Sequence, residues 1–204
     1  MALHEERPAS ADLAFLRDVR LATDRLVLRA PVLKDADRLT ELVGDYEVVK
    51  WLTTVPWPYR RDHALEWLKF ATGPNCPDLS FVMVADDGPI GSIGLRTVMD
   101  APSLGYWLGQ PYWGQGYMSE AVAAVLDFVF DELGASEVHS SIFDHNAASL
   151  RLQERFGFKV VGRKVHSCLA RGHDVPGVVT KLMKSDYESF DAPAIDRGLN
   201  LDEF

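Results

Sequence analysis

The sequence "PYWGQGYMSEA", residues 111–121, decides the fold. Gly114 and Gly116 each disfavour a helix by about 1 kcal/mol relative to alanine, yet the apolar periodicity predicts a helix directly after them, over 117–133. The first N–H groups of a helix lack internal partners and carry partial positive charge. Because glycine lets a ligand approach the backbone, the segment predicts a phosphate cradle. A tight strand-to-helix turn without a ligand is the alternative.

Two other phosphate-binding motifs do not match this segment. A P-loop requires a lysine after its glycines, and none follows Gly116. A dinucleotide-binding turn requires a third glycine within a parallel βαβ unit. The strands predicted before the loop, over 79–85, 90–98 and 103–109, instead indicate an antiparallel meander, since a DDGP turn separates the first two.

The remaining patterns predict one mixed α/β domain. Besides the elements above, we expect strands over 25–30, 136–143, 158–165 and 178–184 and helices over 34–44, 60–70 and 147–156. Asn146 is the candidate N-cap of the last of these helices. No repeat or linker interrupts them. We therefore expect an extension over 1–20, a single domain over 21–184 and an acidic tail over 185–204.

Composition excludes several functional classes. The chain has 204 residues, 47% of them hydrophobic, and a net charge of −9, which disfavours nucleic-acid binding. Cys76 and Cys168 are far apart and the six histidines lack ligand spacing, so we expect no metal. No apolar run is long enough to cross a membrane, and the N-terminus does not read as a signal peptide, which together predict a cytoplasmic protein without membrane partners.

Four motifs in a fixed order carry a family resemblance: "GYWLG" at 105–109, "PYWGQGYMSEA" at 111–121, "NAAS" at 146–149 and "GF" at 157–158. With this order and spacing, the region 21–184 resembles the GNAT family of N-acetyltransferases. More narrowly it is similar to the branch that acetylates ribosomal-protein N-termini. The resemblance implies an α/β fold with a central, mostly antiparallel sheet that is splayed between strands 103–109 and 136–143 and flanked by helices.

The resemblance also implies acetyl-CoA as the cosubstrate. Its pyrophosphate would bind the amides of 114–118, and its pantetheine arm would pair with the backbone near Trp107 and Leu108 and with the side chain of Asn146. The full set of implied cofactor-binding residues is Trp107, Leu108, Trp113, Gly114, Gln115, Gly116, Tyr117, Met118, Asn146 and Ser149.

Acetyl transfer needs a neutral amine, stabilisation of the oxyanion and a proton for the departing thiolate. Many GNAT enzymes supply that proton from a tyrosine seven residues after the asparagine, but here that position is Gln153. In the ribosomal-protein branch a serine three residues after the asparagine takes the role. The resemblance therefore implies Ser149 as the catalytic acid, and a helix-capping or packing serine is the alternative.

The general base is less evident. The branch often has an acidic residue where this chain has Ser103. Asp144, His145 and Glu120 are alternatives that could act through water. His145 and Ser149 also suggest a serine hydrolase, but the GxSxG motif is missing.

The acceptor is expected to be a primary amine. We favour a protein N-terminal α-amine, because the branch points to it, no carboxylate base is evident and the negative chain would attract basic ribosomal partners. A small cationic amine held by Trp57 and Tyr59 is the second hypothesis. A non-catalytic acetyl-CoA sensor is the third, and a homodimer remains an open alternative.

Overall fold

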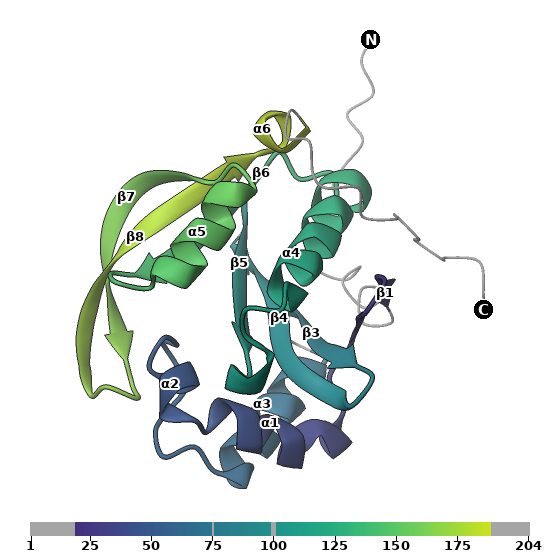
Figure 1. Ribbon diagram of the computed structural model, residues 1–204, viewed down its shortest axis with the longest axis vertical. Coiled ribbons are helices and arrows are strands. Elements are labelled where there is room, and N and C mark those ends of the chain that lie inside the picture. Colours follow the sequence, from purple (N-terminus) through teal and green to yellow (C-terminus); the bar gives the residue numbers. More distant parts are fainter. Residues whose placement is uncertain (1–18, 75, 99–100, 189–204) are drawn as a thin grey trace.

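The computed structural model describes residues 19–74, 76–98 and 101–188. Residues 1–18 of the expected extension and 189–204 of the expected tail lie outside the described residues. The described chain forms one eight-stranded sheet in the order β1-β2-β3-β4-β5-β6-β8-β7 (Figure 1). Its strands are β1 Leu21–Ala22, β2 Val27–Arg29, β3 Asp78–Ala85, β4 Gly88–Val98, β5 Ala101–Leu108, β6 Glu137–Phe143, β7 Lys159–Cys168 and β8 His173–Met183.

Helices connect these strands. The α-helices are α1 Ala36–Val43, α2 Tyr46–Val49, α3 Arg61–Thr72, α4 Tyr117–Asp127, α5 Ala147–Arg155 and α6 Lys184–Glu188. Two short 3-10 turns, Leu33–Asp35 and Gln110–Tyr112, precede α1 and α4, and a π-helical turn over Phe128–Glu132 continues α4. The helix expected over 117–133 is therefore present, with a looser last turn.

The sheet is antiparallel except where β5 meets β6. These two strands run parallel and pair only at Ser103↔His139 and Leu104↔Ser140, after which they separate. By contrast, β5 pairs with β4 over its whole length, from Val98↔Ala101 to Gly91↔Leu108. The mixed α/β fold with a splayed, mostly antiparallel sheet is thus confirmed.

Alternation along the strands gives each face its own helices. In β3, Phe81 and Met83 belong to the core cluster that includes the apolar side of α4, whereas Val82 packs with α1 and α3 on the other face. Figure 1 shows α4 and α5 together on the first face, with α1 and α3 below.

Several elements differ from expectation. The helix α2 was not predicted; Asp45 caps it by accepting a hydrogen bond from the N–H of Glu47 at 2.9 Å. Strand β8 begins five residues earlier than expected, and Pro176 lies within it, opposite Val165. The first residues of the expected tail form α6, whose Tyr187 packs against Phe130.

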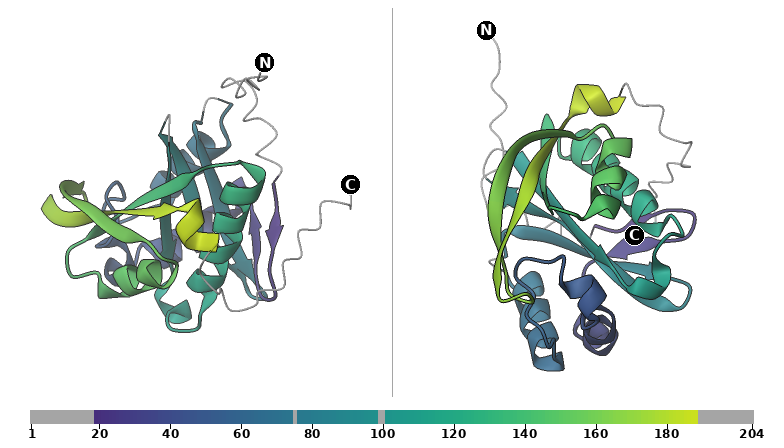
Figure 2. Two further views of the ribbon diagram at one scale, coloured as in Figure 1. Left: turned by 90° about the horizontal axis from the view of Figure 1, so that it is seen from above. Right: turned by 60° about the vertical axis from the view of Figure 1, so that its left-hand side comes forward.

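The hairpin of β7 and β8 bends toward the α1–α3 end of the molecule (Figure 2). In the turn between the two strands, the N–H of Leu169 donates a hydrogen bond of 3.1 Å to the carbonyl of Thr53. The guanidinium of Arg171 donates to the carbonyl of Lys50 at 2.8 Å. These contacts join the segment after α2 to the turn between β7 and β8.

Candidate functional site

A cavity of about 990 Å³ lies where β5 and β6 separate. The beginnings of α4 and α5 line one part of it, and the segment 47–53 and His166 of β7 line another. The residues expected to bind the cofactor that line this cavity are Trp107, Leu108, Trp113, Gly114, Gly116, Tyr117, Met118, Asn146 and Ser149. Segments distant in the sequence thus meet at one cavity.

The two glycines of the loop adopt a conformation that favours glycine. Gly114 and Gly116 have φ values of 74° and 86°, a region that disfavours residues with a Cβ. Gly116 is the N-cap of α4, and the N–H of Glu120 makes a bond back to its carbonyl at 3.1 Å. The N–H groups of Tyr117, Met118 and Ser119 precede that bond, so they lie in the first turn, where helix amides lack intrahelical acceptors. The arrangement fits a pyrophosphate.

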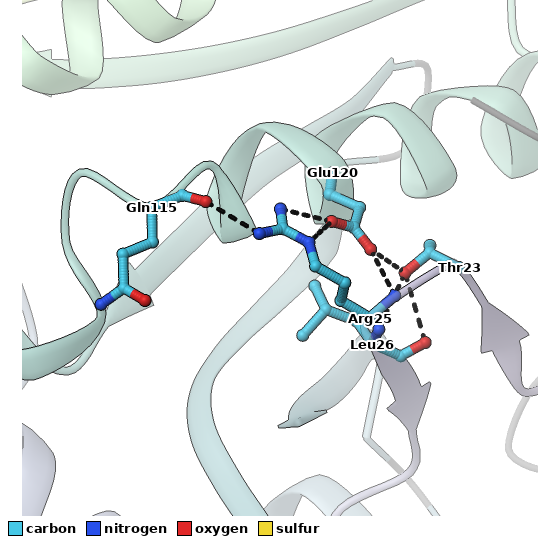
Figure 3. A network of polar contacts seen from close by, with 5 residues as sticks. All are labelled: Thr23, Arg25, Leu26, Gln115 and Glu120. Atoms are coloured by element: carbon cyan, nitrogen blue, oxygen red, sulfur yellow. Dashed lines mark hydrogen bonds and ion pairs between the residues drawn. The ribbon is translucent and has the colours of Figure 1, made fainter. Parts of the chain in front are cut away.

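Charged contacts brace the loop from the β1–β2 hairpin (Figure 3). The Arg25 guanidinium donates to the Gln115 carbonyl at 2.9 Å and to Glu120 Oε2 at 2.8 Å. It also lies 4.6 Å from the centre of the Tyr117 ring. Thr23 Oγ1 donates to Glu120 Oε1 at 2.5 Å. These contacts tie the loop to the sheet and hold the first turn of α4 in place.

The free edge of β5 faces the cavity beyond Leu104. Gly109 donates its N–H to Ile90 on the β4 side, and because directions alternate along a strand, the backbone groups of Tyr106 and Leu108 face away from β4. Within the described residues no strand pairs with them there. The Leu108 carbonyl instead accepts a hydrogen bond from Trp113 Nε1 at 2.7 Å. The backbone of Tyr106 and the N–H of Leu108 are therefore the groups of this edge that face the cavity side without a strand partner.

Asn146 begins α5 as the sequence predicted. Its side-chain oxygen accepts a hydrogen bond from the N–H of Ser149 at 3.2 Å, which is the geometry of an N-cap. The amide nitrogen of Asn146 is not used by this cap. Ser149 therefore stands in the first turn of α5, and its side chain borders the cavity.

A buried polar network lies behind Ser149, which the sequence did not reveal. Ser149 Oγ is 2.7 Å from the hydroxyl of Tyr106. Gln153 Nε2 donates to that hydroxyl at 3.3 Å and to Ser140 Oγ at 2.8 Å. Thr180 Oγ1 donates to Gln153 Oε1 at 2.6 Å. Burial raises the pKa of Tyr106, against the effect of its hydrogen bonds to Ser149 and Gln153.

Three predicted residues are not among those that line the cavity. Gln115 turns back, and its side-chain amide donates to the Pro111 carbonyl at 2.8 Å. Trp57 is 51% exposed and packs edge-on against Tyr46. Tyr59 packs into the cluster between α1 and α3, where burial and then Glu66 raise its pKa to about 12. The sequence grouped Trp57 and Tyr59 with the acceptor site, but the cavity is lined by the preceding segment instead.

Of the candidate bases Glu120, Asp144 and His145, only His145 is among the cavity-lining residues that the structure describes. Glu120 and Asp144 do not line the cavity, and each is paired with an arginine, Arg25 and Arg163 respectively. Burial tends to raise the pKa of Glu120, but hydrogen bonds from Thr23 and Arg25 lower it overall. This disfavours Glu120 as a proton acceptor. His145 does line the cavity, in a left-handed conformation with φ 71°.

His166 is a cavity residue that sequence reasoning missed. Its Nε2 is buried and has no hydrogen-bond partner in the described part of the chain. Burial, and then the charge of Lys164, lower its pKa. Its ring packs against Phe143, 5.6 Å between centroids. No local motif marks His166, since it reaches the cavity only through the bend of the β7–β8 hairpin.

The far end of the cavity is formed by the segment after α2. Trp51 lies here, with Arg171 4.9 Å and Lys50 5.4 Å from its ring centre. Among the described residues that line the cavity, Glu47 is the one carboxylate, and Lys50 Nζ is 2.5 Å from it. The carboxylate at this end is therefore already paired with a cation.

No group of three or more histidine, cysteine, aspartate or glutamate side chains within 19–74, 76–98 and 101–188 is arranged to hold a metal ion. In the same ranges no helix is long and apolar enough to cross a membrane.

A model of the acetyltransferase (GNAT) domain matches residues 25–159. The chain belongs to the GNAT family. Its members use acetyl-CoA, and this chain is an N-acetyltransferase by that membership. The match spans the glycine loop, the splayed strands and Ser149.

Named relatives of this GNAT chain include an uncharacterised N-acetyltransferase, p20, of Bacillus licheniformis. It is 27% identical over 173 residues, which cover 82% of this chain and 97% of the relative. The ribosomal protein uS5-alanine N-acetyltransferase of Escherichia coli (strain K12) is 28% identical over 188 residues, 83% of this chain and 93% of the relative. The chain is therefore similar over nearly the whole length of both proteins.

Among solved structures, the microcin C7 self-immunity acetyltransferase MccE in complex with acetyl-CoA and AMP has the same fold. Its TM-score is 0.67 at 17% identity, and the likeness covers 78% of this chain and 93% of that one. At this identity the likeness establishes the fold alone.

Proposed function

We propose that this chain transfers the acetyl group of acetyl-CoA to the α-amine of a protein N-terminus. One observation carries the proposal. A single cavity joins the glycine loop at the start of α4, the unpaired backbone of β5, Ser149 and the segment 47–53. A long, anionic, thioester-bearing ligand fits such a path, with its phosphates at the helix start and its reactive end beside Ser149.

Each part of the chain has its own task in this proposal. The amides of 114–118 bind the pyrophosphate, while Arg25 holds the loop through Gln115 and Glu120. The backbone of Tyr106 and the amide nitrogen of Asn146 bind the pantetheine arm. Acetyl-CoA supplies an activated thioester whose sulfur departs as a thiolate. The neutral amine nitrogen forms a bond to the acetyl carbon as the C–S bond breaks. Ser149 Oγ donates a proton to the departing sulfur, and the proton that the amine nitrogen loses restores the serine hydroxyl.

An α-amine requires less help from a base than a lysine amine does. Its pKa lies near 7.7–8.0, so a useful fraction is neutral at physiological pH. This agrees with a cavity in which Glu47 is the one described carboxylate and is already paired with Lys50. A polyamine site would be expected to offer unpaired carboxylates, and the ring of Trp51 already has Arg171 and Lys50 beside it. The protein α-amine is therefore favoured over a small polycation.

The test uses labelled acetyl-CoA with four acceptors. Two are peptides, one with a free N-terminus and the same peptide with a blocked N-terminus and an internal lysine. The other two are a polyamine and a lysate of a strain lacking this protein. We expect label on the free peptide and on a protein band of the lysate. Label on the polyamine or in the small-molecule fraction alone would instead support the second hypothesis. Tight acetyl-CoA binding by calorimetry, with no thiol release for any acceptor, would identify a sensor.

A further inference from the structure

The hydroxyl of Tyr106 and that of Ser149 are 2.7 Å apart, and either oxygen could be the donor on distance alone. The direction matters, because Ser149 has a single hydrogen. If that hydrogen points to Tyr106, it is not available to the cavity. The neighbours of Tyr106 decide between the two directions.

Ser140 fixes the orientation of the Gln153 amide. Ser140 Oγ donates its single hydrogen to the Leu104 carbonyl at 2.9 Å, so it can only accept from Gln153. The atom of Gln153 that faces Ser140 is therefore the nitrogen. The oxygen of Gln153 then faces Thr180, whose hydroxyl donates to it. Gln153, with 1% of its surface exposed, is held at both ends.

The second hydrogen of the Gln153 nitrogen is directed at Tyr106. The Tyr106 oxygen accepts it at 3.3 Å, which leaves the phenol hydrogen to be donated elsewhere. Ser149 Oγ is the acceptor that the described residues offer. Because an unsatisfied buried donor costs about 1–3 kcal/mol, the phenol hydrogen goes to Ser149. The hydrogen of Ser149 is thereby free to point into the cavity.

We infer that Tyr106 is a positioning residue that orients the Ser149 hydroxyl toward the reacting sulfur, and that Gln153 sets the direction of this hydrogen bond. The inference rests on the role proposed above for Ser149. A donor to Ser149 Oγ also stabilises the partial negative charge that develops on this oxygen as its proton leaves. Burial keeps the phenol of Tyr106 protonated, since it raises the pKa. Gln153 thus contributes to proton donation by Ser149 indirectly, through its hydrogen bond to Tyr106 on β5.

The test is a double-mutant cycle of Tyr106→Phe and Ser149→Ala. Tyr106→Phe should lower kcat about three- to tenfold, which corresponds to the loss of one hydrogen bond. The KM for the amine and the Kd for acetyl-CoA should not change. In the Ser149→Ala background the same substitution should have no further effect. An equal loss in both backgrounds, or no loss in either, would overturn the inference.

Tyr187→Phe is the matched control. Its hydroxyl also makes a 2.7 Å hydrogen bond, to Asp127, but Tyr187 is not among the cavity residues, so kcat should stay at the wild-type value. If wild type transfers acetyl to none of the acceptors, the proposed function fails rather than this contact. A crystal structure of Tyr106→Phe then decides the positioning role: the Ser149 side chain should leave its present rotamer, and an unchanged single rotamer refutes it.

Discussion

The carboxylate of Glu120 and the residue Arg25 are joined by both backbone and side chain. The Arg25 N–H donates to Oε1 at 2.9 Å, and its guanidinium approaches Oε2 to 2.6 Å. Glu120 lies in the first turn of α4, so this pair connects the β1–β2 hairpin to the helix start that forms the phosphate cradle. The same guanidinium holds the Gln115 carbonyl. Arg25 therefore holds both the glycine loop and the first turn of α4 in position.

Glu120→Gln should therefore loosen the cradle as well as destabilise the fold. Loss of a charge-assisted pair at a side chain with 11% exposure should reduce the free energy of unfolding by about 1–2 kcal/mol. The Kd for acetyl-CoA should rise several-fold, as measured by calorimetry. Asp131→Asn is the control, because Asp131 pairs with Lys184 outside the cavity. An unchanged Kd for Glu120→Gln would show that the brace does not set the loop.

The same pair predicts a pH dependence. Since the pKa of Glu120 is lowered by the fold, its carboxylate stabilises the protein fully above its ordinary value near 4.5. This contribution is lost as the pH falls below that value toward the lowered pKa. The difference in unfolding free energy between wild type and Glu120→Gln should shrink in acid. A difference that is constant from pH 7 to pH 3 would contradict it.

Gly116→Glu should abolish acetyl-CoA binding. The φ of 86° disfavours any side chain, and the new carboxylate would stand at the site proposed for a pyrophosphate. Calorimetry of the folded variant measures the effect. Gly134→Glu is the matched control, since Gly134 also has a positive φ, of 65°, but does not line the cavity. Unchanged affinity in folded Gly116→Glu would refute the cradle.

Ser149→Ala should lower kcat with little change in acetyl-CoA affinity. It removes a proton donor that is used only as the thiolate departs, so ground-state binding is spared. Thiol release at saturating acceptor gives kcat, and calorimetry gives Kd. A loss of affinity with full turnover would assign Ser149 to binding instead.

His166 should make the fold less stable in mild acid. Burial lowers its pKa from the ordinary 6.5, so the unfolded chain takes up this proton first as the pH falls. The free energy of unfolding should therefore decrease below pH 6.5, until the pH reaches the lowered value. His166→Gln should flatten this part of the profile. Parallel profiles for wild type and His166→Gln would be the contrary result.

Local patterns were sufficient for the parts of the fold that depend on neighbours in the sequence. Gly114 and Gly116 predicted a loop with accessible backbone directly before α4, and Asn146 predicted the cap of α5, because each reports a backbone requirement at its own position. The DDGP turn likewise predicted the antiparallel meander, since a tight turn joins two strands that follow one another in the chain. The mixed fold and the family followed from the order of the motifs. The family resemblance singled out Ser149, and the structure adds that this residue lines the cavity.

The acceptor end and the network behind Ser149 were decided by tertiary structure. Trp57 and Tyr59 read as a binding pair, yet packing turns Tyr59 into the α1–α3 cluster, and the bend of β7 and β8 brings His166 to the cavity instead. Tyr106 and Ser149 are 43 positions apart, and their hydroxyls meet only because β5 and α5 flank the same cleft. A hydrogen bond across such a separation depends on how two elements pack, and no periodicity within either element encodes it.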